Sequence, residues 1–167
     1  QLCPARAPAL PGLQGVAASG QHLPRLAVVR PEAVVGHAAA DAERIEQIGV
    51  VPDRVFGLRT KANPAKTVWY FLEVDRATMP VQRAGLRQTS FHRKFVAYCE
   101  TWRQGLLKDR FPRFRVLTVT TSPERARNLA ATCAELPSGH GLFLFTDKAS
   151  LLAHGDPLTH VWQTVHS

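Results

Sequence analysis

The sequence predicts an α/β fold in which a mixed sheet is flanked by helices, and three observations carry this prediction. The stretch TVWYFLEV at residues 67–74 is almost unbroken in apolar side chains, as in a buried strand. Apolar residues at steps of three and four between residues 91 and 106 predict an amphipathic helix. The predicted elements follow the order helix, strand, strand, helix, strand, helix, strand, which is typical of layered α/β domains.

The first part of the chain divides into an arm and a helix. Residues 1–24 are rich in Ala, Pro and Gly and show no sustained periodicity, so we expect a linker or arm there and a single domain over residues 25–167. Residues 31–49 begin with a proline suited to a first helical turn, end at a glycine, and keep apolar residues at helical spacing. This segment is therefore expected to be the first helix of the domain.

A hairpin and a long helix are expected next. Residues 50–58 (VVPDRVFGL) predict one strand, the polar stretch RTKANPAKT predicts a turn, and residues 67–75 predict the second strand. Residues 82–107 predict a helix with an apolar stripe of Phe91, Phe95, Tyr98, Trp102 and Leu106. The helix is expected to pack on the sheet through the first four of these residues.

The remaining elements are two strands with a helix between them. Residues 114–120 (FRVLTVT) and 141–146 (GLFLFT) each predict a short buried strand. Thr121, with Glu124 three residues later, resembles a capping box and predicts the start of a helix over residues 122–135.

The positive charge of the chain is concentrated in one part of it. The formal net charge is +8, and 12 of the 21 basic residues but only three of the 13 acidic residues lie between Arg76 and Arg127. Such asymmetry favours a polyanionic partner, with nucleic acid ahead of an anionic membrane surface. An ordinary solvated basic face is the alternative interpretation.

Composition disfavours several classes of protein. The apolar fraction of 45% argues against disorder, and no apolar run approaches the about 18 residues of a membrane span. The three cysteines show no CxxC pairing, which indicates reduced thiols of a cytoplasmic protein and not a disulfide framework or zinc site. Because the chain starts at Gln1, without methionine, we expect it to be a piece of a longer protein.

Two carboxylates at the end of the apolar strand pose the main question about a site. Side chains alternate along a strand, so Glu73 and Asp75 share one face and lie close together. If the hairpin closes, Asp53 near the start of the first strand joins them at the same edge. Buried carboxylates need a compensating partner. An oxygen-only set suits Mg²⁺ or Mn²⁺; a lysine, an arginine or water are the alternatives.

The motifs around these acids resemble known families. A PD dipeptide on one strand, followed on the next strand by an acid and a second acid or lysine two residues later, resembles the PD-(D/E)XK nuclease pattern. More closely, VPDRVFGL, YFLEVDRATMP, RKFVAY and FRVLTVTTSPERARNLA resemble the replication-relaxation family of plasmid and phage proteins, over about residues 43–163. The resemblance implies a three-layer nuclease-like core, a role in the DNA metabolism of mobile elements, and commonly an N-terminal winged-helix domain, which this chain would lack.

Carried over residue by residue, the resemblance makes Asp53 and Glu73 metal ligands of an active nuclease. Asp75 stands where the nuclease pattern has a lysine, which would orient the attacking water and stabilise developing negative charge. Asp75 is instead expected to be a third metal ligand or a salt-bridge partner. Lys94, at the flank of the apolar stripe, is the candidate to replace the missing lysine.

An acid from the first helix is also expected near this cluster. Glu43 and Glu46 are the two candidates, and the sequence does not choose between them. The phosphates of bound DNA are expected to contact four arginines, namely Arg76, Arg83, Arg87 and Arg93.

The expected function is therefore DNA binding in plasmid or mobile-element replication or relaxation, with metal-dependent cleavage of DNA left open. The alternatives are a catalytically inactive DNA-binding module and a protein-interaction module. In both, Glu73 and Asp75 would form a structural ion network with Lys94 and Arg76, or Lys94 would be solvated. Asp53 would then be an ordinary strand-start residue, and a homodimer is a further open alternative.

Overall fold

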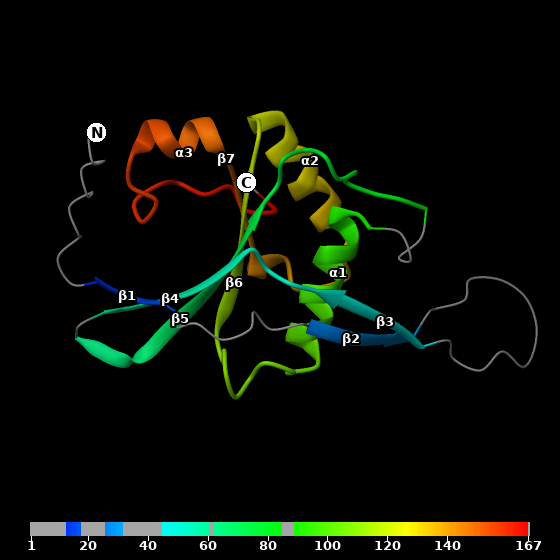
Figure 1. Cartoon of the computed structure of the whole chain (residues 1–167), viewed down its shortest axis with the longest axis horizontal. Coiled ribbons are helices and arrows are strands. Elements are labelled where there is room, and N and C mark those ends of the chain that lie inside the picture. Colours follow the sequence, from blue (N-terminus) through cyan, green and yellow to red (C-terminus); the bar gives the residue numbers. More distant parts are fainter. Residues whose placement is uncertain (1–12, 18–25, 32–44, 61, 85–88, 167) are drawn as a thin grey trace, which may run out of the picture.

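The computed structural model has an α/β fold, as the sequence predicts. It describes residues 13–17, 26–31, 45–60, 62–84 and 89–166. Figure 1 shows α1 and α2 on one side of the central sheet and α3, with the C-terminal segment, on the other side. None of the helices in these ranges is long and apolar enough to cross a membrane.

The described part of the chain contains seven strands and three α-helices. The strands are β1 (Leu13–Ala17), β2 (Leu26–Pro31), β3 (Ile45–Val50), β4 (Arg54–Thr60), β5 (Asn63–Val74), β6 (Phe114–Thr120) and β7 (Phe143–Asp147). The helices are α1 (Phe91–Arg103), α2 (Pro123–Ala134) and α3 (Lys148–His154), with a short 3₁₀ turn, η1 (His140–Leu142), before β7.

The central sheet has the strand order β1-β4-β5-β6-β7. β1, β4 and β5 pair antiparallel, whereas β6 runs parallel to β5 and β7 runs parallel to β6. Parallel neighbours need a crossover connection, which α1 provides between β5 and β6 and α2 provides between β6 and β7. The predicted hairpin is thus confirmed as β4 and β5, and β2 with β3 forms a separate ribbon that packs on α1.

The hydrophobic core lies between the sheet and the helices α1 and α2. The Phe95 ring of α1 lies 5.2 Å from the ring of Phe143 and 5.8 Å from that of Phe145, both on β7. The Tyr98 ring lies 6.0 Å from that of Phe71 on β5. Each of these five side chains belongs to a residue that is at most 1% exposed. The packing of α1 on the sheet through Phe95 and Tyr98 is therefore confirmed.

The C-terminal part of the predicted stripe does not pack on the sheet. Trp102 is 49% exposed, so its assignment to the core is wrong, and Leu106 is 50% exposed. The helix ends at Arg103, and Gly105 adopts a φ of 65°, which turns the chain away. The apolar spacing thus continues past the part of the helix that the sheet covers.

Serine caps set the starts of the two long helices. The N-cap of α1 is Ser90, whose hydroxyl accepts a hydrogen bond from the Arg93 N–H at 3.2 Å, so a start at residue 82 is wrong. The N-cap of α2 is Ser122, whose hydroxyl accepts from the Arg125 N–H at 3.1 Å. The predicted cap at Thr121 is therefore displaced by one residue, because the side chain with the right reach is Ser122.

The predicted first helix over residues 31–49 is wrong where the structure describes it. Residues 45–50 form β3, which pairs antiparallel with β2, and residues 32–44 lie outside the described ranges. Ile48 and Val50 are buried while Gly49 is exposed, which is the alternation of a strand. The few apolar residues of this segment fit both the helical and the strand period. Its pairing with β2 makes the segment a strand.

Part of the expected arm belongs to the central sheet. Within residues 1–24, β1 pairs with β4 as an edge strand, with Val16 opposite Gly57. The other residues of the expected arm lie outside the described ranges.

Candidate functional site

The end of β5 turns three alternate side chains toward the core. Phe71, Glu73 and Asp75 are all buried, whereas Leu72 and Val74 between them are not. Glu73 is only 1% exposed and Asp75 only 3% exposed. The two acids therefore share a face, as predicted, and both have been removed from water.

Glu73 is held by two side chains of α1. Lys94 Nζ forms an ion pair with Glu73 Oε2, and the Tyr98 hydroxyl donates a hydrogen bond to Glu73 Oε1 at 2.6 Å. Lys94 and Tyr98 are four residues apart, so they lie one above the other on the helix face that meets β5. The prediction that Lys94 points toward the acids is confirmed. The hydrogen bond of Tyr98 to Glu73 was not predicted, because the position of Tyr98 in the apolar stripe indicated only packing in the core.

The environment of Glu73 makes its charged form costly. Burial raises the pKa of the Glu73 carboxyl; Lys94 and Tyr98 oppose this rise without cancelling it, and the nearby Asp53 carboxylate adds to it. Burial, followed by the proximity of Glu73, raises the pKa of the Tyr98 hydroxyl well above 10.0. Tyr98 therefore stays protonated and remains a hydrogen-bond donor to the carboxylate.

Asp53 lies at the same edge, immediately before β4. Arg54 pairs with Leu72, so continuing the register by one residue sets Asp53 opposite Glu73. The Asp53 N–H donates to the Leu72 carbonyl at 2.9 Å, and Asp53 Oδ2 accepts from the Val74 N–H at 2.7 Å. Asp53 is exposed, in contrast to Glu73. The structure thus brings the two acids together and gives one Asp53 oxygen a backbone partner.

Asp75 has a cation of its own. Arg125, in the first turn of α2, donates from Nε to Asp75 Oδ2 at 2.8 Å, and the Thr120 hydroxyl donates to the same oxygen at 2.8 Å. The Ala77 N–H donates to Asp75 Oδ1 at 2.9 Å. Burial alone would raise the pKa of the Asp75 carboxyl, but these hydrogen bonds outweigh it and lower the pKa. The strand ends with two buried acids because each has a separate cation from a separate helix.

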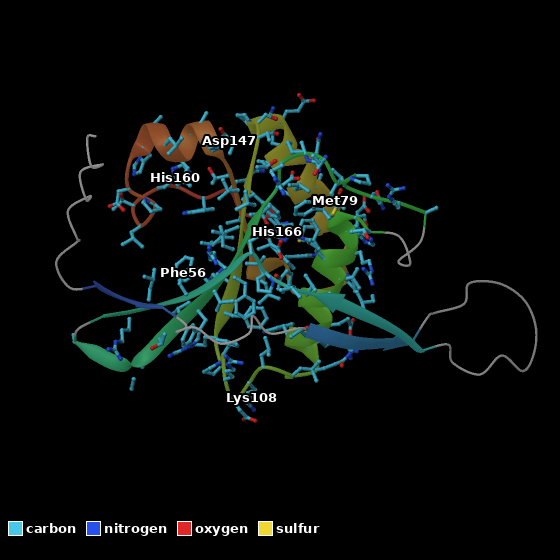
Figure 2. The ribbon with its side chains drawn as sticks, viewed as in Figure 1. Phe56, Met79, Lys108, Asp147, His160 and His166 are labelled. Carbon is cyan, nitrogen blue, oxygen red and sulfur yellow. The ribbon has the colours of Figure 1, made fainter. Side chains whose placement is uncertain are left out.

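Arg125 also fixes the segment that leaves β5. Its Nη2 donates to the carbonyl of Met79 at 2.5 Å, and Figure 2 shows Met79 close to α2. The alternative prediction of an ion network that includes Arg76 is wrong in that partner, since Arg76 is exposed and Arg125 takes the role. Arg125 reaches Asp75 because β6 runs parallel to β5, so that α2 starts at the sheet edge where β5 ends.

The acids do not form an open divalent-cation site in this arrangement. Glu73 uses both oxygens on Lys94 and Tyr98, and Asp75 uses both oxygens on Arg125 and its neighbours. Within the described ranges, no three His, Cys, Asp or Glu side chains gather in a group that could hold a metal ion. A cation bound by Glu73 and Asp53 would have to displace Lys94. Of the two candidate acids from the expected first helix, Glu46 lies on β3 and Glu43 lies outside the described ranges.

The predicted phosphate-contacting arginines lie close to this cluster along the chain. Arg76 and Arg83 are exposed in the segment after β5, and Arg93 precedes Lys94 in the first turn of α1 and is partly buried. Arg87 lies outside the described ranges. Other basic side chains are already paired, such as Arg103, whose Nη2 lies 2.7 Å from Glu100 Oε2.

Comparisons with known proteins give no match: no family model, no curated protein and no solved structure is similar to this chain. The nuclease-like arrangement of the core and the resemblance to the replication-relaxation family therefore stay predictions that rest on the motifs of the sequence.

Proposed function

We propose that this chain is a DNA-binding protein with a nuclease-like core that serves replication or relaxation of a plasmid or related mobile element. The observation that carries the proposal is the imbalance of charge around the end of β5. Glu73 and Asp75 are buried there and paired with Lys94 and Arg125, whereas Asp53, Arg76 and Arg83 are exposed. The exposed charged residues of this set are thus two arginines and one aspartate, which leaves a positive balance.

The same imbalance of charge is found over a longer segment of the chain. Between Arg76 and Arg127 only three acids accompany 12 basic residues, and one of these acids, Glu100, is engaged by Arg103. Lys94 and Arg125 pair with Glu73 and Asp75, which precede this segment, and the ten other basic residues still exceed its three acids. A surface of this kind neutralises phosphates and releases condensed counterions, which favours nucleic acid over a neutral partner.

The salt dependence of binding to duplex DNA tests this proposal. The logarithm of the association constant should fall linearly with the logarithm of the salt concentration. The variant Arg76→Ala should bind all duplex sequences more weakly and flatten the slope by about one unit, for one lost contact.

Arg103→Ala is the matched control, because it removes the same charge at a site already neutralised by Glu100. It should leave the slope close to that of the unmodified protein. Affinity that does not change with salt concentration, or an equal effect of Arg103→Ala and Arg76→Ala, contradicts the proposal.

A metal-dependent DNA endonuclease is the second candidate function. The observation that favours it is the meeting of Asp53, Glu73 and Lys94 from three different elements, with the acids on adjacent strands and the lysine from the following helix. Mg²⁺ or Mn²⁺ would be its cofactor. This candidate requires that Lys94 leave Glu73, and DNA phosphates would offer Lys94 an alternative anionic partner.

A further inference from the structure

A cavity lies on the side of the sheet opposite to α1 and α2. Its volume is about 380 Å³, and its walls come from β4, β5, β6, β7 and the C-terminal segment. Figure 2 shows Phe56, one of its lining residues, on β4. Apart from apolar aliphatic side chains, the lining consists of three aromatic and two basic residues, namely Phe56, Tyr70, Trp162, Arg59 and Lys66.

The aromatic part of the lining is built on paired strands. Phe56 and Tyr70 are opposite each other in the register of β4 and β5, and their rings stack with centroids 5.4 Å apart and an interplanar angle of 21°. Both side chains are only partly buried. Since strands hold side chains more rigidly than loops do, this pair is a preformed flat apolar surface.

Trp162, from the C-terminal segment, also lines the cavity and is held in place by hydrogen bonds. Its indole Nε1 donates to the Pro157 carbonyl at 3.2 Å. The next residue, Gln163, pairs with Phe145 of β7 through two backbone hydrogen bonds of 2.9 Å. The C-terminal segment is thus anchored to the sheet beside the cavity, and it contributes an aromatic side chain to the lining.

The charged residues that line the cavity within the described part of the chain are basic. They are Arg59 and Lys66. Lys66 is exposed. Flat aromatic surfaces combined with cations suit a ligand that carries both planar rings and anionic groups. Single-stranded nucleic acid is such a ligand, because its bases stack on aromatic side chains while its phosphates contact basic ones.

We propose that this cavity binds single-stranded DNA, with bases stacked against Tyr70 and Trp162 and the backbone phosphates contacting Lys66 and Arg59. The cavity volume falls in the about 300–1,000 Å³ range of sites that hold small ligands, so it admits individual bases and not a duplex. Bases of a duplex are also already stacked on one another. The proposal rests on the proposed DNA function and adds a separate site for locally unwound DNA.

The test compares a labelled short oligothymidylate, an abasic strand of the same length and a duplex of the same length by fluorescence anisotropy. Tyr70→Leu removes the ring and keeps apolar cover over Phe56, so it should lower affinity for oligothymidylate about tenfold. It should leave affinities for the abasic strand and the duplex unchanged. Trp102→Leu is the matched control, since Trp102 is an exposed aromatic residue that does not line this cavity.

Lys66→Ala and Lys108→Ala test the ionic part, because both lysines are exposed and only Lys66 lines the cavity. Lys66→Ala should weaken binding of oligothymidylate and of the abasic strand more than Lys108→Ala does. Thermal melts of every variant verify that the fold is retained.

Two results would overturn the proposal: equal binding of oligothymidylate by Tyr70→Leu and the unmodified protein, or equal binding of oligothymidylate and the abasic strand. Duplex binding that persists with its salt dependence while Tyr70→Leu has no effect removes this site alone. Loss of duplex binding while single-strand binding still depends on Tyr70 removes the proposed basic surface alone.

Discussion

Lys94 and Glu73 form an ion pair that joins the first turn of α1 to the end of β5. The lysine side chain is 23% exposed and that of the glutamate only 2% exposed, so the pair sits at the rim of the core with its acid inside. Tyr98 adds a hydrogen bond to the second oxygen of the same carboxylate. The contact couples the position of a helix to the charge state of one buried acid.

Removal of the lysine should destabilise the fold. Lys94→Met keeps the length of the side chain and leaves the Glu73 carboxylate buried without its cation. We expect a loss of about 3 kcal/mol in the free energy of unfolding, at the lower end for a buried pair because Lys94 remains partly exposed. Denaturant unfolding measures this value. Lys108→Met, at an exposed position, is the control, and an equal effect of the two substitutions would mean that the pair contributes little.

The pKa of Glu73 makes stability depend on pH. Because its folded-state pKa is raised above 4.5, the folded protein keeps a proton on Glu73 over the pH range between 4.5 and the raised value, where the unfolded chain has released it. The contribution of Glu73 to stability is therefore fully present below about pH 4.5 and is lost as pH rises through the raised folded-state pKa. In Glu73→Gln this fall should be absent, so the unmodified protein should lose stability relative to the variant as pH rises from about 4.5.

Lys94→Met should strengthen the same dependence, since Lys94 is the main influence that lowers the pKa of Glu73. Its stability should continue to fall to a higher pH than that of the unmodified protein. Unfolding free energies measured from acidic to neutral pH test both statements. Parallel curves for the unmodified protein and Glu73→Gln would contradict the assignment.

The contribution of Asp75 to stability should change with pH in the opposite direction to that of Glu73. Its pKa is lowered from 3.8 by hydrogen bonds led by Arg125, so its contribution is present above pH 3.8 and is lost as pH falls through the folded-state value. Asp75→Asn should therefore flatten the acid limb of the stability curve. Asp109→Asn, in an exposed turn, serves as the control for the loss of one carboxylate. An acid limb that is unchanged in Asp75→Asn would refute the role given to Arg125.

The hairpin, the strand over residues 114–120 and the direction of Lys94 could be predicted because each depends on local periodicity. Lys94 follows from its angle to Phe91 and Phe95 on one helix, and Glu73 from alternation on one strand. The pairing of Asp75 with Arg125 could not be predicted in this way. It depends on β6 being the parallel neighbour of β5, which places the start of α2 beside the end of β5.

The same distinction explains the wrong first helix. Residues 45–50 are too short for their period to separate strand from helix, and the ribbon partner β2 decides the outcome. The exposure of Trp102 likewise depends on where the sheet ends beneath α1. The spacing of apolar residues along α1 does not predict that position.

The last prediction concerns divalent cations and decides whether the cluster can serve a nuclease. In the unmodified protein Lys94 occupies the position from which a cation would reach Glu73, so calorimetric titration with Mn²⁺ should give little heat. Lys94→Ala should expose the Glu73 carboxylate beside Asp53 and bind Mn²⁺ more tightly. The double variant Lys94→Ala with Glu73→Gln should lose this gain, because a neutral amide is a weaker ligand for a hard cation.

Lys108→Ala controls for the removal of one positive charge elsewhere on the protein. A short duplex should also increase Mn²⁺ affinity in the unmodified protein if phosphates draw Lys94 away, since coupling between two ligands is reciprocal. Equal heats from the unmodified protein, Lys94→Ala and the double variant would remove Glu73 from any metal site. The acids would then be structural, and the chain would bind DNA without cutting it.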